Sequence, residues 1–131
     1  MPPGRVADIP THLFGLMLRA RGLEPFITGA DTPWRAIQSA AELPDTRGCV
    51  LSGIDPLGLS DRHVIGRLPR RVPLFTAGPA AAGCRVRRVV RLSNDWRTAA
   101  DTVATTILTK QTERSGQPAH AAHSQELAAT R

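Results

Sequence analysis

The sequence has little of the material that secreted, membrane-spanning or zinc-binding domains need. Its only two cysteines, Cys49 and Cys84, stand far apart, with no Cys-x-x-Cys spacing among the 131 residues. This pattern favours neither a disulfide framework nor a zinc site, and it suits a reducing cytoplasm. No apolar run is long enough to span a bilayer, and no basic segment followed by an apolar stretch marks a secretory signal.

The motifs of common enzymes are also missing. The chain has no Gly-x-Ser-x-Gly, no P-loop and no Gly-x-Gly-x-x-Gly, and Ser52-Gly53 has no matching histidine and acid. Asp55 is a poor phosphoryl acceptor, because Asp8 stands alone where receiver domains hold Mg²⁺ with an acidic pair. The pair His120 and His123 has no cysteine beside it. We therefore expect no metal site and no enzyme; an enzymatic interpretation rests only on fold analogy.

Positive charge is concentrated in one stretch. The net charge is +6, and eight arginines but no acidic residue lie between Arg62 and Arg91. Such a stretch can attract nucleic acid or another polyanion. The alternative is a solvated basic face, because the chain uses sixteen arginines and a single lysine, Lys110, as its surface cations.

Apolar periodicity predicts helices that alternate with short strands. We expect helices over 11–21, 33–41, 60–68 and 96–108, and strands over 24–28, 49–52, 72–76 and 88–92. Ser93 or Asn94 is expected to cap the last helix. Trp34 and Trp96 are interpreted as packing anchors. Two helices carry the clearest apolar faces: Leu13, Phe14, Leu16, Met17 and Ala20 in the first, and Trp96, Ala99, Ala100, Val103, Ala104, Ile107 and Leu108 in the last.

This alternation is typical of an α/β fold: a doubly wound, mainly parallel sheet with flanking helices. Residues 1–111 are expected to form one domain. Residues 112–131 lack an apolar stripe and are expected to form a disordered tail. A strand normally precedes the first helix of such a fold, but the proline-rich start, 1–6, cannot pair inside a sheet. We expect either a different strand order or a chain that starts late relative to its relatives.

Small residues follow the expected strands at Thr28-Gly29, Ser52-Gly53 and Thr76-Ala77-Gly78. Ligands of open parallel sheets bind beyond the carboxyl ends of the strands. These residues leave room for a ligand there, and ordinary turn chemistry is the alternative.

Short motifs occur in a fixed order along residues 2–110. They are Pro2-Pro3-Gly4, Arg21-Gly22, Gly29-Ala-Asp-Thr-Pro33 and Val50-Leu51-Ser52. This order resembles the cobalamin-binding domain, in particular the C-terminal sensor domain of MerR-type transcription regulators.

The resemblance implies a flavodoxin- or Rossmann-like cobalamin-binding architecture and a sensor of a small, cobalamin-like molecule in transcription regulation. DNA would be contacted only through a separate domain or partner, and protomers of such regulators pack into homo-oligomers. No membrane is implied. The ligand-binding positions would be Ser52, Gly53, Ile54, Thr76, Ala77 and Gly78.

The family places a histidine under cobalt with Asp-x-His-x-x-Gly, and His12 begins a His-x-x-Gly here. The helix from His12 to Gly22 is too short for that register by about one and a half turns. Alignment from Pro2 to Gly22 without a gap instead places Ala7, which has no donor atom, at the axial position. Cobalamin would then carry its own base or water on its lower face, and His12 would be a surface residue. The alternative function is ligand-free dimerisation or polyanion and DNA contact through 62–91.

Overall fold

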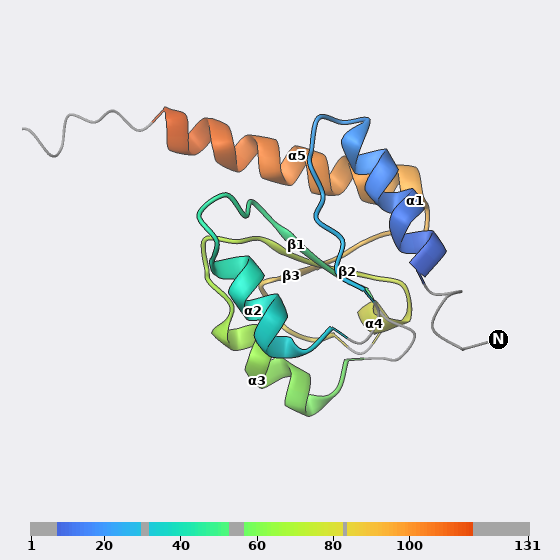
Figure 1. Ribbon diagram of the computed structural model, residues 1–131, viewed down its shortest axis with the longest axis vertical. Coiled ribbons are helices and arrows are strands. Elements are labelled where there is room, and N and C mark those ends of the chain that lie inside the picture. Colours follow the sequence, from blue (N-terminus) through green and yellow to red (C-terminus); the bar gives the residue numbers. More distant parts are fainter. Residues whose placement is uncertain (1–7, 30–31, 53–56, 83, 117–131) are drawn as a thin grey trace, which may run out of the picture.

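Three short parallel strands form the centre of the fold (Figure 1). The computed structural model describes residues 8–29, 32–52, 57–82 and 84–116. Within these segments the sheet has the order β1-β2-β3, with neighbouring strands parallel. The strands are β1 (Cys49–Ser52), β2 (Leu74–Ala77) and β3 (Val89–Arg91).

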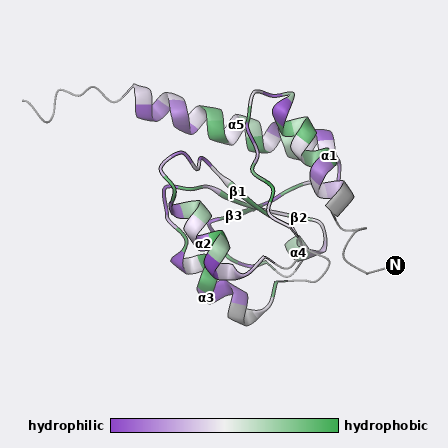
Figure 2. Ribbon diagram, viewed as in Figure 1, coloured by the Kyte–Doolittle hydropathy of each residue, from purple (hydrophilic) through white to green (hydrophobic). Residues whose placement is uncertain are grey.

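Helices lie on both faces of this sheet, which confirms the α/β class (Figure 1). One face is covered by α1 (Asp8–Arg19) and α5 (Trp96–Ser115), which pack against each other. The other face is covered by α2 (Trp34–Glu42) and α3 (Leu59–Arg67), and the short α4 (Pro79–Ala82) follows β2. Figure 2 shows that the strands are mostly hydrophobic, whereas the end of α5 is hydrophilic.

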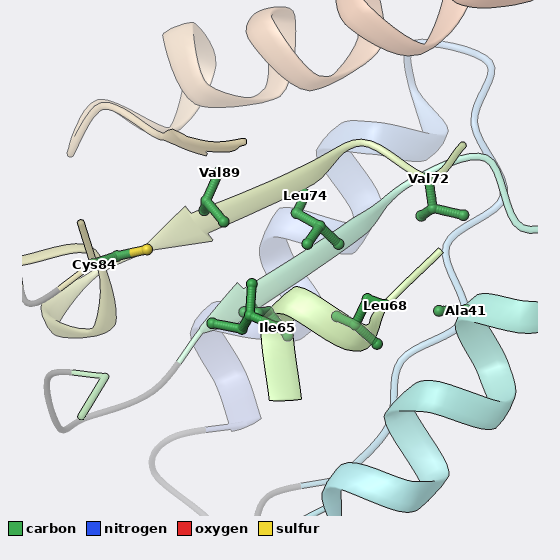
Figure 3. Packing of buried hydrophobic residues seen from close by; sticks show 8 residues of the cluster. Ala41, Ile65, Leu68, Val72, Leu74, Cys84 and Val89 are labelled. Atoms are coloured by element: carbon green, nitrogen blue, oxygen red, sulfur yellow. The ribbon is translucent and has the colours of Figure 1, made fainter. Parts of the chain in front are cut away.

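The central strand β2 joins two hydrophobic clusters. Leu74 points to the cluster under α2 and α3, and Phe75 points to the opposite cluster under α1 and α5. Leu74 and Phe75 are fully buried, as expected for a strand covered on both faces. Figure 3 shows the first cluster, whose buried members are Ala41, Leu51, Ile65, Leu68, Val72, Leu74, Cys84 and Val89.

The strand predicted over 24–28 is wrong. Residues 23–29 form no strand, and a Cβ built on Gly15 of α1 would lie 2.8 Å from Ile27 Cδ1. The segment therefore packs on α1 instead of joining the sheet. Pro25 favours this outcome, because it has no N–H to donate to a strand ladder. Among the described residues β1 pairs only with β2, so it lies at an edge of the sheet.

The predicted apolar faces of two helices are buried only in part. In α1 the side chains of Leu13 and Leu16 are 45% and 59% exposed, whereas Leu18 is buried. In α5 the middle of the predicted stripe is buried, but Trp96 and Leu108 are exposed, so Trp96 is not a packing anchor.

The boundaries of α5 also differ from the prediction. Its N-cap is Asp95 rather than Ser93 or Asn94, and the Asp95 carboxylate accepts a hydrogen bond from the Thr98 N–H at 3.1 Å. Hydrogen bonds from Thr98 hold the pKa of Asp95 below its ordinary value. At the other end α5 continues to Ser115, so residues 112–115 are helical. The expected tail beyond this point, 117–131, lies outside the described residues.

Candidate functional site

The predicted ligand edge is formed by the carboxyl ends of β1 and β2. Ser52 lies opposite Ala77 in the strand register, and Thr76 lies opposite Leu51. The chain then turns at Gly78, whose φ of 65° favours glycine, and enters α4. Of the six predicted ligand-binding residues, the structure thus places Ser52, Thr76, Ala77 and Gly78 at one edge, whereas Gly53 and Ile54 lie outside the described residues.

The most unusual atom at this edge is the hydroxyl oxygen of Thr76. The residue is fully buried, and its Oγ1 has no hydrogen-bond partner within the described part of the chain. A buried hydroxyl without a partner costs about 1–3 kcal/mol. Such groups in native proteins call for an explanation, and an ordered water or a ligand is a common one.

The described side chains at this edge include two hydroxyl groups and no metal-ligating group. Thr76 offers a hydroxyl that can donate or accept, Ser52 is exposed, and Gly78 adds no side chain. No group of three histidine, cysteine or acidic side chains comes together among the residues that the structure describes. Ala7, the expected axial position, lies outside them.

His12 lies elsewhere. It is exposed in α1 and lines a cleft of about 250 Å³ between this helix and the segment that carries Pro25 and Ile27. The remaining lining residues of this cleft are Gly15, Leu16 and Arg19. His12 and Gly15 therefore both lie within α1, and the His12 side chain is on the helix surface.

Part of the arginine-rich stretch is structural, which the sequence analysis missed. The Arg71 guanidinium donates to the carbonyl oxygens of Ala41, Glu42 and Leu43 at the end of α2, and of Thr46, at 2.8–3.2 Å. Helix ends leave carbonyl groups without intrahelical partners, and α2 ends at Leu43-Pro44 with no glycine cap. The arginine side chain takes over this role.

Arg88 likewise donates hydrogen bonds to backbone carbonyl groups that follow the end of α3. Its guanidinium donates to the carbonyl oxygens of Leu68 and Pro69, both at 2.8 Å, and of Val72 at 3.3 Å. The signal in the sequence is again a helix that runs into leucine and proline, Leu68-Pro69, with no glycine. Burial and the neighbouring charge of Arg70 lower the pKa of Arg88 from its ordinary value.

A cleft of about 340 Å³ lies beside this second arginine. Its lining residues are Gly66, Arg70 and Arg88. Arg70 is exposed and makes no hydrogen bond within the segments that the structure describes. Because Arg88 precedes β3 and Arg70 precedes β2, the cleft lies at the amino ends of the strands, opposite the ligand edge.

The two cysteines carry no reactive chemistry. Both are free thiols, Cys84 is buried, and burial raises the pKa of Cys49 to about 11. A thiol with so high a pKa is almost entirely protonated near neutral pH and is a poor nucleophile. Both thiols pack in the cluster of Figure 3 and serve as apolar side chains.

Comparison of the chain with protein-family models, with curated proteins and with solved structures found no match. None of the helices within the described segments is both long and apolar enough to cross a membrane.

Proposed function

We propose that this chain is a sensor domain that binds a small, cobalamin-like molecule at the carboxyl edge of its sheet and takes part in transcription regulation. The Thr76 hydroxyl, which has no partner among the described residues, carries the proposal, because a ligand group at this edge would supply the hydrogen bond that those residues do not. The parallel order of the strands supports it, since ligands of open parallel sheets bind at this edge.

In this proposal Ser52 and Thr76 bind polar groups of the ligand, and Ala77 and Gly78 leave space for it. Gly53 and Ile54 complete the set by their place in the sequence. Cobalamin would keep its own base or water on the lower face, because Ala7 has no donor atom. The module would act without catalysis in the cytoplasm, as a homo-oligomer, and a separate domain or partner would contact DNA.

The test is a visible-absorbance titration of the purified chain with hydroxocobalamin and, in the dark, with adenosylcobalamin. A saturable spectral change, with the corrinoid retained on a desalting column, is the expected result. Thr76→Val removes the hydroxyl at nearly constant shape and should weaken binding, whereas the matched control Thr98→Val on the exposed start of α5 should not. Unchanged binding by His12→Ala is expected. No spectral change with the folded protein would overturn the proposal.

The second candidate is an interaction module that contacts a polyanion without a small ligand. The observation in its favour is that Arg67, Arg70, Arg85 and Arg87 are exposed in a stretch without acidic residues. A DNA probe should then bind with an affinity that falls steeply with salt. No binding at low salt would remove this candidate.

A further inference from the structure

We propose that the cleft lined by Gly66, Arg70 and Arg88 is a binding site for the phosphate group of a small molecule. The site lies at the amino ends of the strands, so it is separate from the ligand edge and does not depend on the proposed sensor function.

The first argument is the donor chemistry of the cleft. A guanidinium has five N–H groups, and the three hydrogen bonds of Arg88 to carbonyl oxygens leave two for another acceptor. Arg70 has no hydrogen bond inside the described segments, so its whole planar fork is available. Arginine forks match the geometry of phosphate oxygens and bind them with charge-assisted hydrogen bonds.

The second argument is that two like charges meet with nothing to compensate them. No acidic residue of the described segments lines the cleft, and none occurs in the sequence between residues 62 and 91. Arg70 is close enough to Arg88 to lower its pKa. A dianionic phosphate would remove this repulsion.

The third argument concerns Gly66. Glycine inside a helix costs about 1 kcal/mol relative to alanine, and a Cβ built on Gly66 would meet no atom within 4 Å. Neither packing nor backbone conformation therefore requires glycine here. What its missing side chain provides is open space at the wall of the cleft.

The size and shape of the cleft favour a small ligand over nucleic acid. Its volume of about 340 Å³ lies near the lower end of the range for small-molecule sites, roughly 300–1,000 Å³. Arg88 is held in place by its carbonyl partners, so little side-chain freedom is lost on binding. The two guanidinium groups in this single cleft suit a terminal phosphate, which carries up to two charges. A nucleic-acid duplex would have to be contacted at many points along its backbone.

The experiment is an NMR titration of the ¹⁵N-labelled chain at constant ionic strength and pH 7.5. The probes are inorganic phosphate, glycerol 3-phosphate and, as the uncharged control, glycerol. We expect saturable shifts of the Gly66 amide and of the Arg70 and Arg88 Nε signals with the phosphates only. A response to inorganic phosphate alone identifies the free ion as the ligand, and a stronger response to glycerol 3-phosphate identifies a phosphate ester.

Three variants separate this site from diffuse charge. Arg70→Gln should weaken phosphate binding at least about tenfold, because it removes a charge-assisted donor. Gly66→Glu should abolish binding by placing a carboxylate in the open space, while the amide spectrum shows the fold intact. Arg97→Gln, at the start of α5 on the opposite face, removes the same charge and should bind normally.

Three results would overturn the proposal. The first is the absence of saturable shifts with either phosphate. The second is equal weakening by Arg70→Gln and Arg97→Gln. The third is a response only to a DNA duplex, spread over the exposed arginines and steeply salt-dependent, which would assign the surface to nucleic acid instead. Because corrinoid absorbance reports on the other edge of the sheet, failure of this proposal and failure of the sensor proposal are distinguishable.

Discussion

Replacement of Arg71 by methionine should lower the free energy of unfolding by about 2–3 kcal/mol. The side chain donates four hydrogen bonds, three of them from Nη2, which carries only two hydrogens. At most three bonds can therefore form at once, and a net value of about 0.7–1 kcal/mol each gives the expected loss. This is a large share of the total, since domains of this kind are stable by about 5–15 kcal/mol.

The assay is urea unfolding followed by far-ultraviolet circular dichroism, with an unchanged slope in urea as evidence that only stability has altered. The matched control is Arg47→Met, because Arg47 is exposed, lies in the connection from α2 to β1 that Arg71 contacts, and makes no hydrogen bond inside the described segments. Arg71→Lys should lose an intermediate amount, since an ammonium group lacks the planar fork. A loss below about 1 kcal/mol, or one equal to that of Arg47→Met, would refute the argument that Arg71 caps α2.

Four further substitutions test other parts of the structure. Thr76→Val should raise the free energy of unfolding of the ligand-free protein by about 1 kcal/mol, because it removes a buried hydroxyl without a partner; a lower urea midpoint would contradict this. Gly48→Ala should cost about 1–3 kcal/mol, since its Cβ would lie 2.8 Å from Ile107 Cδ1, whereas Gly66→Ala should stabilise α3 by up to about 1 kcal/mol. Equal urea midpoints for the two glycine variants would show that the space around them is misjudged. Burial raises the pKa of Cys49 from an ordinary 9.0 to about 11 in the folded chain. Between these two pH values the thiol is protonated in the folded state and mostly ionised in the unfolded state. Stability should therefore be constant below pH 9 and fall by about 2–3 kcal/mol as the pH rises to 11, and Cys49→Ala should remove that fall.

The strands and helices that the sequence predicts correctly are those with strong local signals. β1 begins and ends as predicted over 49–52, because a short apolar run stands between glycines. α3 is also close to its prediction: its start is fixed locally by Asp61, whose carboxylate accepts a hydrogen bond from the Gly58 N–H at 2.7 Å. The same carboxylate accepts one from Trp34 Nε1 at 3.1 Å, so Trp34 does anchor α2 to α3.

Features that depend on distant parts of the chain were not predictable. Residues 24–28 have strand-like composition, but whether they pair depends on a neighbouring strand rather than on their own sequence. The hydrogen bonds by which Arg71 and Arg88 cap α2 and α3 join residues 16–30 positions apart. The sequence around either arginine does not indicate which carbonyl groups it contacts. The meeting of the carboxyl ends of β1 and β2 at one edge was predictable, because the strands are parallel. Ligand binding at that edge stays a prediction. The partnerless state of the Thr76 hydroxyl required the structure.

The contact between α1 and α5 has a consequence for the order in which the chain can fold during synthesis. Leu18 of α1 shares its cluster with Val103 and Ile107 of α5, and Arg21 pairs with Asp101 at 2.6 Å, 80 positions away. The buried residues of the cluster of Figure 3 lie between 41 and 89, and Trp34 and Ile37 pack against them, so this cluster can assemble earlier on the ribosome. α1 can therefore reach its native packing only after almost the whole described chain has been synthesised. Until α5 leaves the ribosome, the side chains of Leu18 and Phe75 lack their packing partners from α5.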